Sequence, residues 1–169
     1  TNLVNFPVLV RLTDNELKHT SSGGKVTNIN GFDIVFTSSN GTTLINHQVE
    51  RYDPVTGELV AWVQIPLLSA TVNTDFYLYF GNSTVSIDPS TTATWDANYK
   101  ATSHLNPNLN DATANGNTLT PTATLNETVS VAADGRDIET VEKLQAAGNA
   151  GLLINGDITM EAWVNFETV

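Results

Sequence analysis

Short runs of apolar residues, broken at close intervals by glycine, asparagine, serine and threonine, constrain the fold of this chain more than any other feature. Four of these runs are long enough to be β-strands: residues 6–12, 32–36, 59–66 and 75–80. Strands usually span about five or six residues, whereas helices need longer periodic segments. We therefore expect an all-β fold, an antiparallel β-sandwich of jelly-roll type with at most one short helix.

Alternation within these runs predicts which side chains face the core. One face of residues 75–80 is apolar, and Tyr77 and Tyr79 lie on the opposite face. Residues 59–66 are largely apolar on both faces, a pattern typical of a central strand. Residues 44–52 follow an Asn-Gly turn and alternate poorly, so we expect an outer or edge strand there. The first run has one wholly apolar face, made of Phe6, Val8, Val10 and Leu12.

The chain changes character after the fourth run. Residues 82–94 are rich in serine, threonine, aspartate and proline, and we interpret them as a linker with a domain boundary near residue 90. This division gives a first domain over residues 1–90 and a second unit over residues 91–169. In the second unit the pattern predicts a helix over residues 137–148 and a regular strand over residues 158–166.

The composition excludes several classes of partner. Lys and Arg total 7 against 18 Asp and Glu, which gives a net charge of −11. A surface with so few cations does not neutralise phosphates, so we expect no nucleic acid among the partners. No apolar stretch approaches the length of a membrane-spanning helix, so we expect no direct membrane insertion. The chain has no cysteine, which excludes disulfides and thiolate metal sites. Abundant asparagine and threonine resemble the composition of secreted or cell-surface proteins.

Four segments of the first unit carry a family resemblance. They are Asn5–Leu12, Gly31–Phe36, Val60–Pro66 and Phe76–Asn82. In this order they resemble a prokaryotic surface-protein domain whose function is not established. In that family the domain usually precedes a laminin-G-like or concanavalin A-like jelly roll, and its first strand normally begins upstream of the point where this chain starts. The resemblance therefore implies a jelly roll in the second unit.

The second unit resembles such a jelly roll in three places. Gly156–Val164 is similar to a strand of laminin-G-like domains, and Ser103–Leu105 and Asp111–Asn117 are similar to their opening strand and loop. The aromatic-Asp-Gly strand that usually lies between these signatures has only a poor counterpart, at Ala133–Arg136. A complete jelly roll needs roughly 150 to 200 residues, more than the second unit contains. We expect the N-terminal part of a longer jelly roll, truncated here, or a sheet that something else completes.

Aromatic side chains provide one candidate ligand site. Trp62, Tyr77 and Tyr79, together with Tyr52, would form a platform for stacking sugar rings if they share an exposed sheet face. The alternative is that the neighbouring unit covers Trp62. The apolar character of both faces of its strand favours this alternative.

An asparagine-rich loop provides a candidate metal site. Oxygen ligands suit calcium, and laminin-G-like domains, which the second unit resembles, often hold calcium at a loop rim. The candidate ligands are Asn108, Asn110, Asp111 and Asn115, with Asn106 and Asn117 nearby. The alternative is a series of ordinary turns, because asparagine tolerates left-handed backbone conformations and bonds to its own chain.

Residue patterns typical of catalysis are not visible in the sequence. A glycoside hydrolase on this kind of fold needs two facing acids, and Glu139, Glu142 and Glu161 are scattered. His47 and Glu50 are close in the sequence, but strand alternation sends them to opposite faces. We therefore expect that the protein is not an enzyme, and we nominate no catalytic residue.

These observations favour a non-catalytic module for extracellular recognition or adhesion, secreted or at the cell surface. Its expected partner is a glycan or another cell-surface polymer, and glycan binding follows from the family resemblance. The alternative is a structural subunit of a surface layer or extracellular filament. In that case residues 158–166 would leave a sheet edge with which another copy of the chain pairs.

Overall fold

A computed structural model describes residues 1–130, 132–139, 141–148 and 150–166 of the chain. The chain forms two compact units, Thr1–Tyr99 and Lys100–Val169. The described residues contain β-strands and turns but no α-helix, so none of them forms a helix that could cross a membrane. Four short 3-10 segments are present: η1 Asn15–Leu17, η2 Thr20–Ser22, η3 Thr92–Thr94 and η4 Ala150–Leu152. The expected all-β class with antiparallel sheets is confirmed.

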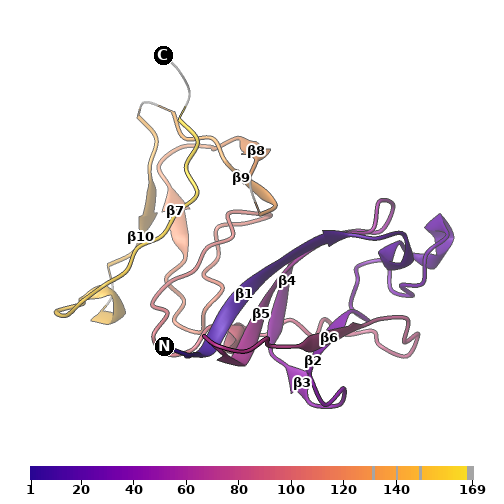
Figure 1. The fold of residues 1–169 in the computed structure, drawn as a ribbon. Coiled ribbons are helices and arrows are strands. Elements are labelled where there is room, and N and C mark those ends of the chain that lie inside the picture. The colour runs from indigo at the N-terminus through magenta and orange to yellow at the C-terminus, as the bar shows by residue number, and fades with distance from the viewer. Residues whose placement is uncertain (131, 140, 149, 167–169) are drawn as a thin grey trace. The chain divides into compact units, whose positions relative to one another are not determined.

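Two three-stranded antiparallel sheets make up the first unit (Figure 1). The first sheet has the order β1-β5-β4, and the second sheet has the order β3-β2-β6. Their strands are β1 Leu3–Thr13, β2 Val35–Ser38, β3 Leu44–Ile45, β4 His47–Asp53, β5 Glu58–Leu68 and β6 Phe76–Tyr79. As predicted, β5 is a central strand and residues 44–52 lie at sheet edges. They form two strands, β3 and β4, in different sheets, where a single strand was predicted.

The inner faces of the two sheets enclose one hydrophobic core. Its buried members include Ile34, Phe36, Ile45, Leu59, Ala61, Val63 and Ile65. Most of the alternating residues that were predicted to face inward pack against this core: Val8, Val10, Leu12, Phe76, Leu78 and Phe80. Phe6, on the same predicted face as Val8, is 38% exposed instead. Burial of apolar surface contributes about 25 cal/mol per Å², so the apolar face of each sheet is stabilised by covering the other. The arrangement is that of a β-sandwich.

A β-bulge interrupts the pairing of β4 with β5. Val49 pairs with Ala61 and Arg51 pairs with Val60, so Glu50 is an extra residue on β4. The extra residue reverses the alternation, which places Arg51 on the outer face although Val49 packs against the core. Simple alternation would have put these two side chains on the same face, and that expectation is wrong.

The strand β2 begins at Val35, later than the apolar run predicted. The carboxylate of Asp33 accepts hydrogen bonds from the backbone N–H groups of Thr27, Asn28 and Gly81, at 2.8, 3.0 and 2.9 Å. These bonds hold the residues before Val35 in a turn rather than in the sheet ladder.

Residues 88–99 fold onto the first unit along the edge of β4. The backbone N–H of Val49 donates to Ser90 Oγ at 3.1 Å, and the N–H of Thr91 donates to the carbonyl oxygen of His47 at 3.0 Å. An edge strand otherwise presents backbone groups to any chain that can pair with them. This segment, which begins close to the boundary suggested by composition, therefore belongs with the first unit.

Among its described residues, the second unit contains two pairs of short antiparallel strands. β7 (Leu119–Pro121) pairs with β10 (Leu144–Ala146), and β8 (Glu127–Val129) pairs with β9 (Asp134–Arg136). The predicted helix over residues 137–148 is wrong, because β10 lies within that range; Thr140 is outside the described residues. The backbone N–H of Thr122 donates to the carbonyl oxygen of Lys143 at 3.0 Å and extends the β7–β10 ladder. Pairing with β7 therefore overrides the helix propensity of this short apolar stripe.

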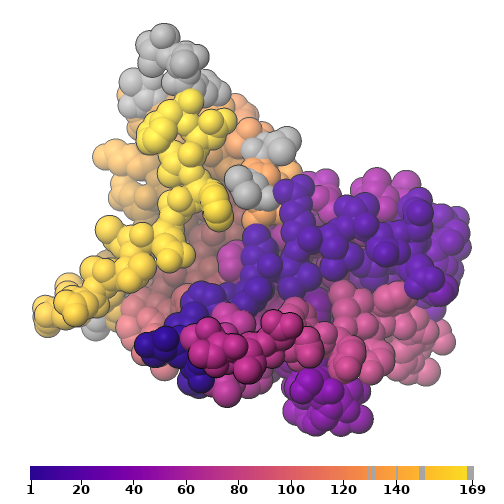
Figure 2. Space-filling view, in the orientation of Figure 1, coloured from indigo at the N-terminus to yellow at the C-terminus, as the bar shows by residue number. Residues whose placement is uncertain are grey.

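Residues 158–166 form no strand, although alternation predicted one. All of these side chains are exposed, including Met160 at 86% and Phe166 at 88%. The yellow C-terminal part of the chain accordingly lies at the surface in the space-filling view (Figure 2). A strand needs a neighbour to satisfy its backbone, and none of the described residues supplies one here. Residues 99–105 form no strand either.

Candidate functional site

Two exposed tyrosines lie side by side on the outer face of the second sheet. Tyr77 and Tyr79 are 48% and 47% exposed, their ring centroids are 6.4 Å apart, and their planes are inclined by 60°. They point outward because they alternate along β6 with Phe76 and Leu78, which pack against the core. Their orientation is the one that alternation predicted.

Three neighbouring residues extend this surface. Thr37 of β2 pairs with Tyr77 on one side and with Leu44 of β3 on the other, and Val35 pairs with Tyr79. Directly paired residues of an antiparallel ladder share a face, so all five belong to the outer side of the sheet. Leu44 is 68% exposed. We call the surface formed by Val35, Thr37, Leu44, Tyr77 and Tyr79 the tyrosine face.

The loop between β2 and β3 borders the tyrosine face with polar groups. Asn40 Oδ1 accepts hydrogen bonds from the backbone N–H groups of Thr42 and Thr43, at 3.0 and 2.9 Å, and Asn40 Nδ2 donates to Thr43 Oγ1 at 2.8 Å. Gly41 has a φ of 75°, and a Cβ atom there would lie 3.2 Å from the hydroxyl oxygen of Tyr79. The loop is therefore held by its own hydrogen bonds next to one of the rings.

The second sheet is free of charged residues. No Asp, Glu, Lys, Arg or His occurs within residues 34–46 or 76–87, although the chain contains 7 basic and 18 acidic residues. Asp33 directly precedes the first range, but it is 2% exposed and its carboxylate is bonded to backbone donors. The tyrosine face thus combines apolar and hydrogen-bonding groups without charge. This gap in the charge pattern was visible in the sequence and would have drawn attention to Thr37 and Leu44.

The hydroxyl group of Thr37 is buried and lacks a hydrogen-bond partner among the described residues. The neighbouring Phe36 points into the core, so Thr37 belongs to the opposite, outer side of β2. Thr37 as a whole is 4% exposed, and it lies between Tyr77 and Leu44 in the ladder. An unsatisfied buried hydroxyl costs about 1–3 kcal/mol, so such a group in a folded protein calls for an explanation.

Trp62 does not share a sheet face with Tyr77 and Tyr79. It lies on β5 of the first sheet, where its indole Nε1 donates to Glu50 Oε2 at 2.6 Å. Its ring centroid is 5.3 Å from that of Trp95, which is 7% exposed. Trp62 is therefore covered by the segment 88–99 and is not part of an open platform with the two tyrosines.

Tyr52, the fourth aromatic residue considered, packs against the hydrophobic core. Its hydroxyl donates to the carbonyl oxygen of Leu17 at 2.7 Å. Burial, followed by the negative charges of Asp33 and Asp53, raises the pKa of Tyr52 to about 12. Its hydroxyl therefore stays neutral and serves as a fixed donor to a loop of the first unit.

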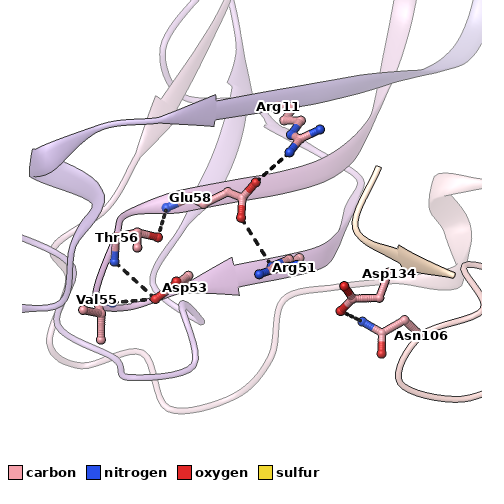
Figure 3. Close-up of polar contacts among 8 residues, drawn as sticks. All are labelled: Arg11, Arg51, Asp53, Val55, Thr56, Glu58, Asn106 and Asp134. Atoms are coloured by element: carbon pink, nitrogen blue, oxygen red, sulfur yellow. Dashed lines mark hydrogen bonds and ion pairs between the residues drawn. The ribbon is translucent and has the colours of Figure 1, made fainter. Parts of the chain in front are cut away.

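An ion-pair network crosses the outer face of the first sheet (Figure 3). Glu58 of β5 lies between Arg11 of β1, at 3.0 Å from its Nη2, and Arg51 of β4, at 3.3 Å from its Nε. The β-bulge makes this possible, because it turns Arg51 outward. The two faces of the sandwich therefore differ: the first sheet carries paired charges and the second sheet carries none.

His47 and Glu50 lie on opposite sides of β4, as alternation predicted. His47 is 3% exposed, contacts Phe36 edge-on at 5.2 Å between ring centroids, and has Nδ1 at 3.1 Å from the carbonyl oxygen of Ile45. Glu50 instead accepts from Trp62 on the outer face. The two side chains do not form an acid-base or metal-binding pair.

Asp111 organises the asparagine-rich loop that was a candidate calcium site, with ordinary turns as the alternative. Its Oδ1 accepts from the backbone N–H groups of Thr102 and Thr113, both at 3.0 Å. Its Oδ2 accepts from Thr113 Oγ1 and from the N–H of Asn117, both at 2.8 Å. Burial alone would raise the pKa of Asp111, but these hydrogen bonds outweigh it and hold the pKa below its usual value.

This arrangement does not fit a calcium site. Calcium takes six to eight oxygen ligands, as a rule, whereas both oxygens of Asp111 face N–H and O–H donors. Asn108 Oδ1 accepts from the N–H of Asn110 at 2.9 Å, and Asn115 Nδ2 donates to the carbonyl oxygen of Lys100 at 3.3 Å. Within the described ranges, no three His, Cys, Asp or Glu side chains are grouped to hold a metal ion. The geometry is that of turns held by asparagine side chains.

The two flanking asparagines also act as donors. Asn106 Nδ2 donates to Asp134 Oδ2 at 2.9 Å (Figure 3), and Asn117 Nδ2 donates to the carbonyl oxygen of Lys100 at 2.6 Å. The Oδ1 atoms of the two side chains take no part in these two bonds. These bonds tie the loop to other parts of the second unit.

The second unit also has an open depression, lined by Leu109, Pro121, Thr122, Ala123, Thr124, Leu125 and Arg136. The guanidinium of Arg136 donates from Nη1 to Glu127 Oε1 at 3.2 Å and from Nη2 to the carbonyl oxygen of Pro107 at 3.0 Å. The depression has no aromatic lining, and the charge of Arg136 is paired. It offers less to a ligand than the tyrosine face does.

Residues 30–106 match a protein family described as a domain of unknown function, DUF2341. The matched range contains the second sheet with the tyrosine face, β4, β5 and the segment 88–99. No curated protein and no solved structure matches the chain at a significant level. The resemblance of the first unit to a domain of unknown function is thus confirmed over this range.

Proposed function

We propose that the first unit is a non-catalytic recognition module that binds a glycan at the tyrosine face. The observation that carries the proposal is the pair Tyr77 and Tyr79, half exposed on an uncharged sheet beside a polar loop. Aromatic rings offer flat apolar surfaces to the C–H faces of sugar rings, while sugar hydroxyls need hydrogen-bonding groups at the border. The tyrosine hydroxyls and the Asn40 loop are such groups.

The face is held in place before any ligand arrives. Phe76 and Leu78 anchor β6 in the core on either side of Tyr77, and the loop at Asn40 is closed by its own hydrogen bonds. Ordering a mobile surface would oppose binding, so a surface fixed by the core binds with a smaller loss of conformational entropy. The proposal includes a partner at the cell surface, such as a glycan or another surface polymer. It also includes a secreted or cell-surface location.

The proposal is tested by screening the chain on a glycan array, with light scattering on the same sample. We expect saturable binding by a monomer, lost in the double variant Tyr77→Ala, Tyr79→Ala. Val55→Ala is a matched control, because Val55 is 65% exposed on a turn of the first sheet. Absence of any glycan binding, or equal binding by the double variant, would count against the proposal.

A second candidate function is supported by residues 158–166. Their alternating side chains, including Ile158, Met160 and Val164, are all exposed, so a further strand is needed to cover them. In a structural subunit of a surface layer or filament, another copy of the chain would supply this strand. The expected result is a mass that grows with concentration and falls back in Met160→Lys. A constant monomer mass contradicts it.

The similarity of Gly156–Val164 to a laminin-G-like strand supports another way of covering the same side chains. In this proposal other strands of a jelly-roll sheet pair with residues 158–166, and the backbone amides of these residues are then protected from hydrogen exchange.

A further inference from the structure

We infer that the tyrosine face selects an uncharged glycan, bound as a single soluble chain, and that the Thr37 hydroxyl is one of the groups that contact it. This inference rests on the proposed glycan-binding function and adds to it the class of ligand and a binding residue. Three separate observations carry it: the absence of charge, the inclination of the two rings, and the buried hydroxyl of Thr37 beside Tyr77.

The charge pattern argues for a neutral ligand. Sugars that carry carboxylates or sulfates are bound most strongly by cations, and residues 34–46 and 76–87 contain none. The rest of the chain is strongly acidic, with a net charge of −11, and repels polyanions. A neutral sugar needs no cation and is not repelled by the acidic chain, because stacking and hydrogen bonding do not depend on charge.

The ring geometry argues for a single chain rather than the flat surface of an insoluble polymer. The planes of Tyr77 and Tyr79 are inclined by 60°, with centroids 6.4 Å apart. Two rings that are so inclined cannot both lie flat on one plane. Successive sugars of a soluble chain can rotate about their glycosidic bonds, so that each stacks on its own ring.

The buried hydroxyl of Thr37 gives the face a hydrogen-bonding group at its centre. It lies between Tyr77 and Leu44 in the ladder, and its lack of a partner costs free energy in the unbound protein. Side chains as exposed as these two change rotamer on the ps–ns timescale. A small displacement of either one opens the hydroxyl to a sugar hydroxyl, which satisfies it.

The ligand class is tested by affinity electrophoresis and calorimetry with three kinds of probe. These are soluble neutral polysaccharides (glucan, mannan and xylan), a soluble polyuronate, and crystalline cellulose. We expect the purified chain to bind at least one soluble neutral polysaccharide, with an affinity that does not change between low and high salt. Tyr77→Ala should abolish this binding, and Val55→Ala should preserve it.

The outcomes separate the inference from the function on which it rests. Binding to the polyuronate alone, binding that weakens in salt, or binding to crystalline cellulose alone overturns the inference but leaves glycan recognition intact. Failure to bind any glycan, on these probes and on the array, overturns both.

The contribution of Thr37 is tested with Thr37→Val, which has the same shape and lacks the hydroxyl. We expect this variant to bind the neutral polysaccharide about five to ten times more weakly, the loss of one hydrogen bond. Its thermal unfolding midpoint should be higher than that of the parent chain, because an unsatisfied buried group has been removed. Thr37→Ser, which keeps the hydroxyl, is the control and should retain most of the affinity. Unchanged affinity in Thr37→Val contradicts the role of this residue.

Discussion

The carboxylate of Asp33 accepts a hydrogen bond from the backbone N–H of Gly81, at 2.9 Å and 48 positions along the chain. The bond joins a residue two positions before β2 to a residue two positions after β6, the two strands that carry most of the tyrosine face. The same carboxylate also accepts from Thr27 N–H, Thr27 Oγ1 and Asn28 N–H. One buried charge thus fixes one end of the proposed binding surface.

Replacing Asp33 with Asn should destabilise the first unit in a way that depends on pH. Burial alone would raise the pKa of Asp33, but the hydrogen bonds from Thr27, Asn28 and Gly81 outweigh it and hold the pKa below its usual value. A pKa lowered by folding stabilises the folded state above the unfolded pKa, about 3.9, and this stabilisation is lost as the pH falls through the folded pKa. We expect a loss of about 3 kcal/mol in Asp33→Asn at neutral pH, measured by urea unfolding.

The matched control is Asp75→Asn, an exposed carboxylate next to β6. It should change the free energy of unfolding little at any pH. The difference between the parent chain and Asp33→Asn should shrink once Asp33 is protonated in both states. A difference that is the same at neutral and at strongly acidic pH contradicts this account.

In the second unit, Asp111 should act as a hydrogen-bond acceptor rather than as a calcium ligand. Its four donors include the backbone amides of Thr102, Thr113 and Asn117. We expect these amides to lose protection from hydrogen exchange in Asp111→Asn, and calcium to leave their exchange rates in the parent chain unchanged. Protection that increases on adding calcium and falls with a chelator would establish the metal site that this geometry does not support.

The ion pairs of Glu58 should contribute little stability. Arg11 and Arg51 are 52% and 37% exposed in their side chains, and exposed ion pairs are worth about 0–1 kcal/mol because water and salt screen them. We expect Glu58→Gln to lower the free energy of unfolding by less than about 1 kcal/mol, with the difference decreasing at high salt. A larger loss that persists in high salt would show that Glu58 acts through packing instead.

Gly57 should tolerate no side chain. It has a φ of 75°, and a Cβ atom would lie 2.1 Å from the backbone oxygen of Asp14. Gly23 has a φ of 86° with nothing near its Cβ position. Gly23→Ala therefore measures the cost of the backbone conformation alone, about 1–2 kcal/mol. Gly57→Ala should cost at least about 2 kcal/mol more, because backbone must move. Equal unfolding free energies for the two variants would show that the turn at Gly57 relaxes freely.

Local pattern was sufficient to predict much of the sandwich. Two apolar faces placed β5 in the centre of its sheet, and alternation along β6 placed Tyr77 and Tyr79 outside. Prediction from local pattern failed where residues that are distant in the sequence form hydrogen bonds with the backbone. Asp33 draws its own segment into a turn, and pairing with β7 makes a strand of residues 144–146. Neither partner can be identified from the local sequence.

For the candidate site, too, local pattern predicted some features, and contacts between distant residues determined the others. Alternation gives the face of a side chain within its strand but not the sheet to which the strand belongs, so it could not show that Trp62 lies on a different sheet from Tyr77 and Tyr79. The bulge at Glu50 also lies beyond simple alternation, because one extra residue inverts every face that follows it. In the asparagine-rich loop, the donors that occupy the carboxylate of Asp111 include Thr102, nine positions away, and that partner cannot be identified from the local sequence.

Trp95 is the main anchor of residues 88–99 on the first unit. Its ring lies 5.3 Å from Trp62 and 5.2 Å from Tyr99 between centroids, and its Nε1 donates to Gln48 Oε1 at 2.7 Å. The anchor explains why the first unit extends to Tyr99, although the polar composition before Trp95 is typical of a linker.

Replacing Trp95 with Ala should therefore release this segment and destabilise the first unit. A tryptophan that is 7% exposed typically costs about 3–5 kcal/mol on truncation to alanine. The N–H groups of Val49 and Thr91, which bond along the edge of β4, should exchange faster with solvent in the variant. Trp163→Ala is the control, since Trp163 is 70% exposed and should affect neither quantity. If Trp95→Ala leaves both amides protected, residues 88–99 are held by their backbone bonds alone, and the aromatic stack is dispensable for the boundary at Tyr99.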